Sequence, residues 1–325
     1  MNASVGVVES TGAAGDITTV RVVNRELVAA GVVSLQLQSA TAGALPSWEP
    51  GAHIDVLLPN DMVRQYSLCG DPEDSGSWRI AVLREQDGRG GSAYIHDHVT
   101  CGSELRVRGP RNNFTLEPRD RYLFIAGGIG ITPLLPMMAR AARRGAEFDL
   151  LYGGRSRPSM AFVHELGHYG DRVRLWPKDE FGHLDLDGAF ADPRYDAVYC
   201  CGPEPLLAAV EQHGAARPDG FVHIERFRAA TMDRPTATAC EVVLDRSGTS
   251  YHVPADRSIL EVLDEAGEDV AYSCTEGTCG TCETRVLAGE IEHRDSVLSP
   301  AERRNGDRMM ICVSRCQSRR LVLDM

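Results

Sequence analysis

Four cysteines near the C-terminus constrain what this 325-residue chain can fold into. Cys274, Cys279 and Cys282 follow the spacing Cys-x4-Cys-x2-Cys, and Cys312 comes after 29 intervening residues. Four thiolates with this spacing can hold a 2Fe-2S cluster. The spacing therefore predicts a small redox domain at this end of the chain.

The residues around these cysteines leave two alternatives open. Gly277 and Gly280 allow the positive φ values that turn backbone N–H groups toward the cluster sulfurs. A structural zinc site is one alternative, although zinc ligands usually come as two short-spaced pairs. Cys316 is also a rival to Cys312 as the fourth ligand. We favour Cys312, because residues 309–312 read as a strand that brings it to the cluster.

Composition and charge argue against a nucleic-acid-binding, a membrane-spanning or a secreted, disulfide-rich protein. The chain has 46 Asp and Glu residues against 34 Lys and Arg, and its net charge of −12 argues against nucleic acid as a partner. Residues 122–139 carry no charge, but glycines and prolines among them indicate strand, loop and helix rather than a membrane span. The ten cysteines are unevenly spaced and nothing indicates export, so we expect a cytoplasmic protein without a disulfide framework.

The order of β-type and helical segments predicts three domains. Short β-type runs between turn residues predict a small antiparallel barrel, and apolar runs alternating with helices predict a parallel, doubly wound sheet. A hairpin around Ser247-Gly248 and the capping box Ser258-x-x-Glu261 predict a compact third domain. The barrel runs are residues 18–24, 32–39, 53–58, 64–68, 78–83 and 104–109; those of the parallel sheet are 122–126, 148–152, 173–176, 197–201 and 222–224, with a helix over 133–143.

These patterns also predict the bounds of each part. Residues 1–16 are expected to be a disordered lead-in, and residues 228–239 read as a linker. The barrel is expected over residues 17–118 and the parallel-sheet domain over 119–227. The cysteine-rich domain is expected over 240–325.

Two motifs in the parallel-sheet domain are candidates for a nucleotide site. Residues 127–133 read Gly-Gly-Ile-Gly-Ile-Thr-Pro between an apolar strand and a helix. Gly128 and Gly130 would let a pyrophosphate approach the backbone, and Thr132 would cap the helix. Cys201 ends a later strand of the same sheet, where ligands of open α/β folds bind. A tight turn without ligand and a buried cysteine are the alternatives.

Two tetrapeptides in the barrel are candidates for a phosphate cradle. Arg64-Gln65-Tyr66-Ser67 lies on a predicted strand, and Arg89-Gly90-Gly91-Ser92 opens a predicted helix. An arginine fork and a glycine-rich helix N-terminus suit the phosphate of a flavin, with Tyr66 available against its ring. An exposed arginine and an ordinary turn would also explain these residues.

Taken together, the five motifs resemble the phthalate dioxygenase reductase family over residues 18–325. Vanillate demethylase reductases and the reductase portions of self-sufficient haem-thiolate monooxygenases are similar. The resemblance implies a flavin barrel, a nicotinamide-nucleotide domain and a β-grasp ferredoxin domain. It implies that Arg64, Tyr66, Ser67, Gly91 and Ser92 bind the flavin, that Phe227 covers the flavin, and that Gly128, Gly130, Thr132 and Cys201 line the nucleotide site. Further candidates are Gln65, Arg89 and Gly90 for the flavin site and Arg155 for the nucleotide site. The candidates for catalysis of the hydride transfer are Cys201, Ser67 and Phe227.

The resemblance and the cofactor chemistry predict an electron-transfer reductase. A nicotinamide gives up a hydride and an iron-sulfur cluster accepts one electron, so a flavin is expected between them. We expect FMN, with FAD as the alternative, and NADH. Arg155 and Arg157 could hold the 2′-phosphate of NADPH instead. The expected acceptor is a terminal oxygenase, either Rieske-type or haem-thiolate. A ferredoxin-like carrier with regulatory flavin domains and a flavin reductase acting on a small molecule are the rival functions.

Overall fold

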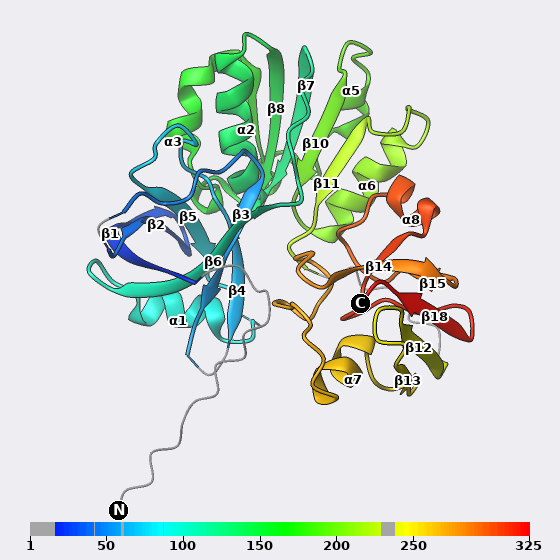
Figure 1. Ribbon diagram of the computed structural model, residues 1–325. Helices are drawn as coiled ribbons and strands as arrows, with labels where there is room; N and C mark the ends of the chain where they lie inside the picture. Colours follow the sequence, from blue (N-terminus) through cyan, green and yellow to red (C-terminus); the bar gives the residue numbers. More distant parts are fainter. Residues whose placement is uncertain (1–16, 42, 60–61, 87, 229–237) are drawn as a thin grey trace, which may run out of the picture. The chain divides into compact units, whose positions relative to one another are not determined.

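The computed structural model describes residues 17–41, 43–59, 62–86, 88–228 and 238–325 (Figure 1). They fall into two compact units, one within Asp16–Ala230 and one within Thr231–Met325. The first two predicted domains therefore share one unit, and their bounds stay predictions. The expected lead-in over residues 1–16 lies outside the described residues, as do residues 229–237 of the expected linker.

An antiparallel sheet forms the first part of the first unit. Its strand order is β4-β3-β6-β1-β2-β5, and alternate residues such as Ile54 and Val56 of β3 join Leu35 in one buried core. The edge strands meet where the Cys69 N–H donates to the carbonyl of Arg79 at 2.8 Å, so the barrel is partly closed. The elements are β1 (Thr18–Ala29), β2 (Val32–Ser39), β3 (Ala52–Leu57), β4 (Val63–Ser67), β5 (Trp78–Leu83), α1 (Gly91–His98) and β6 (Glu104–Asn112).

A five-stranded parallel sheet forms the second part, with the order β11-β10-β7-β8-β9. Helices α2 and α3 cover one face and α5 and α6 the other (Figure 1), which explains why every residue of β10 is buried. The predicted antiparallel barrel and parallel sheet are confirmed. The elements are β7 (Arg121–Gly127), α2 (Ile131–Arg143), β8 (Glu147–Gly154), α3 (Val163–Leu166), β9 (Val173–Pro177), α4 (Lys178–Phe181), α5 (Leu186–Phe190), β10 (Ala197–Cys201), α6 (Glu204–Gly214) and β11 (Val222–Glu225).

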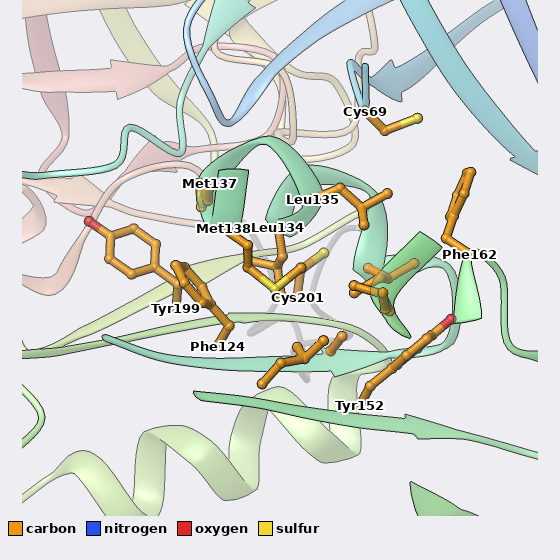
Figure 2. Packing of buried hydrophobic residues seen from close by; sticks show 14 of the residues in the cluster. Cys69, Phe124, Leu134, Leu135, Met137, Met138, Tyr152, Phe162, Tyr199 and Cys201 are labelled. Carbon is orange, nitrogen blue, oxygen red and sulfur yellow. The ribbon is translucent and has the colours of Figure 1, made fainter. Parts of the chain in front are cut away.

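One apolar core joins the barrel to the parallel sheet. Figure 2 shows Cys69 of the barrel near Leu135 of α2 and Phe162, with Cys201 and Tyr199 of β10 in the same cluster. The Tyr199 hydroxyl donates to the carbonyl of Thr115 at 3.2 Å, in the segment that connects the two parts. Because they share a core, the two parts pack as one body.

The described part of the second unit has a mixed five-stranded sheet, a two-stranded sheet and two short helices, as the prediction of a compact α+β domain requires. Its order is β13-β12-β18-β14-β16, with β12 parallel to β18 and the other pairs antiparallel. The predicted hairpin and the capping box of Ser258 and Glu261 are confirmed. The elements are β12 (Cys240–Leu244), β13 (Ser250–Val253), α7 (Ile259–Glu265), β14 (Glu283–Ala288), β15 (Ile291–Glu292), α8 (Pro300–Asn305), β16 (Arg308–Met310), β17 (Arg315–Cys316) and β18 (Arg320–Leu323).

The uncharged stretch over residues 122–139 divides as predicted. It forms most of β7, a 3₁₀ turn over Gly128–Gly130 and the first part of α2. Within the described ranges, no helix has the length and apolar character needed to cross a membrane.

Candidate functional site

The strand order of the parallel sheet places a topological switch point between β7 and β10. The chain continues from β7 toward β8 on one side of β7 and returns to β10 on the other side. Ala126 pairs with Cys201 at the carboxyl ends of the two strands. Helices α2 and α6 start just beyond, and their N-termini favour an anion. Open α/β sheets bind their ligands at such a switch point.

The glycines of the first motif serve two different purposes. A Cβ on Gly130 would lie 2.2 Å from the carbonyl oxygen of Cys201, and one on Gly127 would lie 2.6 Å from Cδ of Pro203. These glycines let the two loops pack backbone against backbone. Gly128 has φ +56° and faces open space, so it alone of the three offers the approach to a ligand that the motif predicts.

Thr132 does not cap helix α2, contrary to the prediction. The helix begins at Ile131 with Gly130 at the N-cap, and no side chain caps it. Thr132 is buried, and its hydroxyl donates to the carbonyl of Ile129 at 3.0 Å. The 3₁₀ turn before the helix moves the cap position to a glycine, which leaves the first N–H groups for a ligand.

Cys201 lies beside an acidic group that the sequence reasoning missed. Glu225 pairs with Cys201 across the parallel strands, and its Oε2 is buried without a hydrogen-bond partner in the described part of the chain. Burial raises the pKa of the Glu225 carboxyl to about 8, and burial followed by the charge of Glu225 raises the pKa of the Cys201 thiol well above its usual value. A protonated carboxyl and a neutral thiol therefore lie side by side at the carboxyl ends of β11 and β10 near pH 7.

Phe227 ends the first unit with its ring in solvent. It is 42% exposed, so it is not part of the buried core. The preceding Arg226 donates to Glu204 at 3.1 Å and to Glu211 at 2.7 Å, and both acids belong to α6. This anchoring fixes the segment that carries Phe227 at the edge of the sheet. Exposed aromatic rings of this kind can stack on a planar ligand.

The arginines after β8 differ in their surroundings. Arg157 forms a bidentate ion pair with Glu180, with distances of 2.7 and 3.1 Å. Arg155 is exposed, and the Asp179 N–H donates to its carbonyl at 3.2 Å. A 2′-phosphate at this position would therefore meet the carboxylate of Glu180 together with the arginines.

The two barrel motifs meet at the N-terminus of α1. The Arg64 guanidinium donates to the carbonyl of Arg89 at 3.0 Å and to that of Val63 at 2.8 Å. A Cβ on Gly91 would lie 2.6 Å from the Arg64 side chain, so glycine is needed for the arginine to cross the helix start. Gly90 is the N-cap in the left-handed conformation, without a side-chain cap. An arginine beside free helical N–H groups fits a phosphate.

Ser67 and its neighbour His53 present buried polar atoms on the same strand pair. They lie opposite each other in the register of β3 and β4, and neither Ser67 Oγ nor His53 Nε2 has a hydrogen-bond partner among the described residues. Burial lowers the pKa of His53 to about 4, so the imidazole is neutral. Buried polar atoms normally have partners, and the polar edge of a flavin would supply them. No sequence motif pointed to His53.

The other members of the barrel motifs have internal roles. Gln65 donates from Nε2 to Asp55 at 3.1 Å, and the Ser92 hydroxyl accepts from the Glu85 N–H at 3.0 Å. Tyr66 packs against the barrel core, and burial raises the pKa of its hydroxyl above its usual value. Tyr66 is half-buried, which leaves part of its ring for a ligand.

The four predicted cluster cysteines form two neighbouring pairs. Cys279 acts electrostatically on its neighbour Cys274 and Cys312 on its neighbour Cys282, and the charge of Cys274 also acts on Cys282 and Cys312. Across the described ranges, no group of three or more His, Cys, Asp or Glu side chains is arranged around a single ion. Two pairs fit a cluster with two irons, each held by two thiolates, better than one zinc ion.

The loop between these cysteines directs backbone N–H groups at sulfur. Gly277 and Gly280 have φ +72° and +75°, as predicted. The Glu276 N–H donates to Cys274 Sγ at 3.3 Å, and the backbone of Gly277 acts on Cys312. Such donors stabilise thiolates and tune the potential of a cluster.

Cys316 is excluded as a cluster ligand because it forms a disulfide with Cys240. This single disulfide, which the sequence did not predict, joins the start of β12 to β17. Cys312 lies beyond the end of β16 rather than on it, since the strand stops at Met310. The turn after Met310 brings Cys312 to Cys282, while the next strand carries Cys316 away.

Comparison with known proteins assigns the family. A model described as an oxidoreductase FAD-binding domain matches residues 19–116, and one described as a 2Fe-2S iron-sulfur cluster binding domain matches residues 242–317. The toluene-4-sulfonate monooxygenase system reductase subunit of Comamonas testosteroni is 42% identical over 302 residues, which cover 91% of this chain and 95% of the relative. The chain belongs to the reductase components of oxygenase systems.

Solved structures of such reductases have the same fold. Phthalate dioxygenase reductase, described as a modular structure for electron transfer from pyridine nucleotides to a 2Fe-2S cluster, is 38% identical with a TM-score of 0.69, covering 95% of this chain and 98% of that one. A type IV self-sufficient cytochrome P450 monooxygenase is 42% identical with a TM-score of 0.89; the match covers 95% of this chain and 41% of the larger protein. The oxygenase-system reductase is thus an oxidoreductase with flavin and 2Fe-2S domains, as predicted.

Proposed function

We propose that this oxygenase-system reductase oxidises NADH at an FMN site and delivers single electrons through its 2Fe-2S domain to a terminal oxygenase of the Rieske or haem-thiolate type. The arrangement that carries the proposal is the presence, in one chain, of a switch point in the parallel sheet, a phosphate cradle on the barrel and two cysteine pairs. When bound, the flavin accepts two electrons as a hydride and releases them one at a time. Oxidation of NADH suits a cytoplasmic protein.

The chain's own residues bind and orient the reacting groups in this proposal. Arg64 and the N–H groups of α1 hold the flavin phosphate, with Gln65, Tyr66, Arg89, Gly90, Gly91 and Ser92 building the cradle. Ser67 donates to the polar edge of the flavin, and Phe227 covers its ring. Gly128 and Arg155 contact the nucleotide beside Cys201, and Gly130 and Thr132 shape the loop that holds Gly128 in place. Cys274, Cys279, Cys282 and Cys312 hold the cluster.

The cradle at α1 supports FMN over FAD. The cradle consists of one arginine, Arg64, and the N-terminus of one eight-residue helix, α1. The Arg64 side chain occupies the space where a side chain at position 91 would lie. This suits a single terminal phosphate. Glu180 supports NADH over NADPH, because its carboxylate neutralises Arg157 and would repel a 2′-phosphate.

The cofactors can be identified directly in the purified protein. We expect denaturation to release FMN, chemical analysis to find two irons and two labile sulfides per chain, and kcat/KM for NADH to exceed that for NADPH by about tenfold or more. Release of FAD or a preference for NADPH would contradict the finer assignment. Zinc without sulfide would contradict the cluster itself.

Substitution of Arg64 tests the phosphate cradle. We expect Arg64→Ala to weaken flavin binding by about 1.5–3 kcal/mol, since hydrogen bonds to charged groups contribute that much. Flavin titration of the apoprotein measures the change. Arg21→Ala is the matched control, because Arg21 lies on the same barrel and is paired with Glu104 at 2.8 Å. Equal affinities of the two variants would remove Arg64 from the flavin site.

A further inference from the structure

Arg79 of β5 makes an unusually complete set of contacts between the barrel and the parallel-sheet part of the first unit. Its guanidinium donates to the carbonyl of Cys69 from Nε at 3.2 Å and from Nη2 at 2.6 Å. It also forms a bidentate pair with Glu165, with both distances 2.9 Å. The Arg79 side chain is 28% exposed, so these four hydrogen bonds are partly shielded from water.

The partner segment around Glu165 is shaped to receive this guanidinium. Phe162 precedes helix α3 and has φ +62°, a left-handed conformation that costs an aromatic residue free energy. Its buried ring lies under Arg79, with 5.0 Å from Cζ to the ring centroid. The helix start therefore offers a ring face and a carboxylate to the same arginine. Backbone strain of this kind persists where the surroundings fix it, and it often marks a functional position.

On the barrel side, the contact reaches the proposed flavin motif. Cys69 is two residues after Ser67, and its N–H donates to the carbonyl of Arg79 at 2.8 Å. The Leu68 N–H donates to Ala52 at 2.8 Å, so the segment continues β4 along the sheet edge. Arg79 therefore holds the Cys69 backbone through both its carbonyl and its side chain. A shift of Arg79 would be passed to Ser67 over two residues.

On the other side, the contact reaches the edge of the proposed nucleotide site. The segment that carries Phe162 and Glu165 leaves the carboxyl end of β8 at Gly154. A Cβ on Gly154 would lie 2.3 Å from Met160 Cγ, so the segment folds tightly back on the strand end. The Tyr152 hydroxyl donates to the carbonyl of Ala161 at 3.2 Å and fixes it further. Figure 2 shows Phe162 and Tyr152 in one cluster with Cys69.

We propose that Arg79 is a positioning residue for hydride transfer, which sets the geometry between the segment that follows Ser67 and the nucleotide-binding edge of the parallel sheet. It touches neither cofactor in this proposal, which rests on the proposed function. Hydride transfer requires close approach and alignment of donor and acceptor, and a displacement of about 1 Å can cost a factor of about 100 in rate. The Arg79 guanidinium, which donates to the Cys69 carbonyl and to the Glu165 carboxylate at the same time, restricts such displacements.

Other ion pairs between the same two parts provide a control. Arg140 of α2 contacts Glu49 at 2.9 Å, and Glu49 is 65% exposed. Arg140 also approaches Glu73 at 3.8 Å, so its guanidinium joins the two parts through two exposed carboxylates rather than through Cys69. Exposed pairs of this kind contribute little to stability. Arg140→Gln therefore removes a charge and both ion pairs from the same interface while leaving the contact of Arg79 with Cys69 in place.

The test compares Arg79→Gln, Arg79→Lys and Arg140→Gln in the full-length holoprotein. We expect the rate of flavin reduction by saturating NADH, measured in a single turnover, to fall about 10- to 100-fold in Arg79→Gln. Flavin content and the Kd for NADH should stay within about twofold. The rate of flavin reduction in Arg79→Lys should lie between those of Arg79→Gln and the wild type, because an ammonium cannot form both paired contacts. Arg140→Gln should match the wild type.

Hydrogen exchange gives a readout that does not depend on activity. Peptides over residues 67–70 and 155–166 should exchange faster in Arg79→Gln than in Arg140→Gln, with or without flavin. A wild-type rate of flavin reduction in Arg79→Gln would overturn the inference. So would a loss of rate that only follows loss of flavin. If Arg79→Gln does not fold, the same measurements of flavin reduction and hydrogen exchange on Arg79→Lys and Glu165→Gln test the inference. A wild-type protein whose flavin neither nucleotide reduces would instead contradict the proposed function.

Discussion

Cys312→Ser is expected to reduce electron transfer to a protein acceptor by about 100-fold or more while the flavin stays reducible by NADH. Loss of a ligand should cost more than the 10- to 100-fold that changes around a metal site typically cost. Cytochrome c or the terminal oxygenase serves as the protein acceptor. Ferricyanide is small enough to take electrons at the flavin, so its reduction should continue near the wild-type rate.

Cys316→Ser is the matched control for this experiment. Cys316 lies four residues after Cys312 and is held by Cys240 in a disulfide, so its loss should leave iron, sulfide and protein-acceptor activity nearly unchanged. Iron and sulfide analysis of both variants shows which cysteine holds the cluster. If Cys316→Ser lost the cluster and Cys312→Ser kept it, the proposed ligand set would be wrong. Full cytochrome c reduction by a cluster-free variant would contradict the electron path.

Gly130→Ala is expected to lower the free energy of unfolding of the first unit by about 3 kcal/mol or more. The added Cβ would lie 2.2 Å from the oxygen and 2.4 Å from the carbonyl carbon of Cys201. Both are backbone atoms, so the added Cβ would overpack the region severely. The loops after β7 and β10 would have to separate to make room for it. The three tryptophans, Trp48, Trp78 and Trp176, all belong to the first unit, so their fluorescence during denaturant unfolding reports on this unit.

Gly128→Ala separates packing from backbone conformation. Gly128 faces open space at φ +56°, so alanine there costs about 1 kcal/mol, the price of a left-handed residue. It should also weaken NADH binding if Gly128 faces the nucleotide, whereas Gly130→Ala acts through the fold. Equal destabilisation by the two substitutions would show that the loops do not pack as tightly as the distances indicate.

The secondary structure was predictable because each domain has a strong periodic pattern. The barrel strand over Val32–Ser39 and the sheet strand over Ala197–Cys201 have the predicted bounds, since turn residues or helix-starting residues follow them directly. The C-terminal end of helix α2 was predicted correctly, but its N-cap residue was not. Threonine is a better N-cap than glycine in general, and only the 3₁₀ turn explains the difference.

The residues that the sequence reasoning missed are defined by contacts across strands. Glu225 matters because the parallel register places it beside Cys201, and His53 because the antiparallel register places it opposite Ser67. Neither belongs to a motif with a fixed spacing. The pairing of Cys316 with Cys240, 76 residues apart, depends in the same way on the order of strands in the mixed sheet. Spacing predicts local sites well, whereas register has to be observed.

The presence of both units on one polypeptide affects the rate at which the cluster receives electrons. Residues 16–230 and 231–325 are consecutive in the chain, so the cluster domain encounters its flavin domain as an intramolecular partner. A covalent connection makes electron transfer between the two units intramolecular. In the proposed path, the rate of this step therefore does not depend on the concentration of the protein, whereas the rate of encounter with a separate oxygenase does.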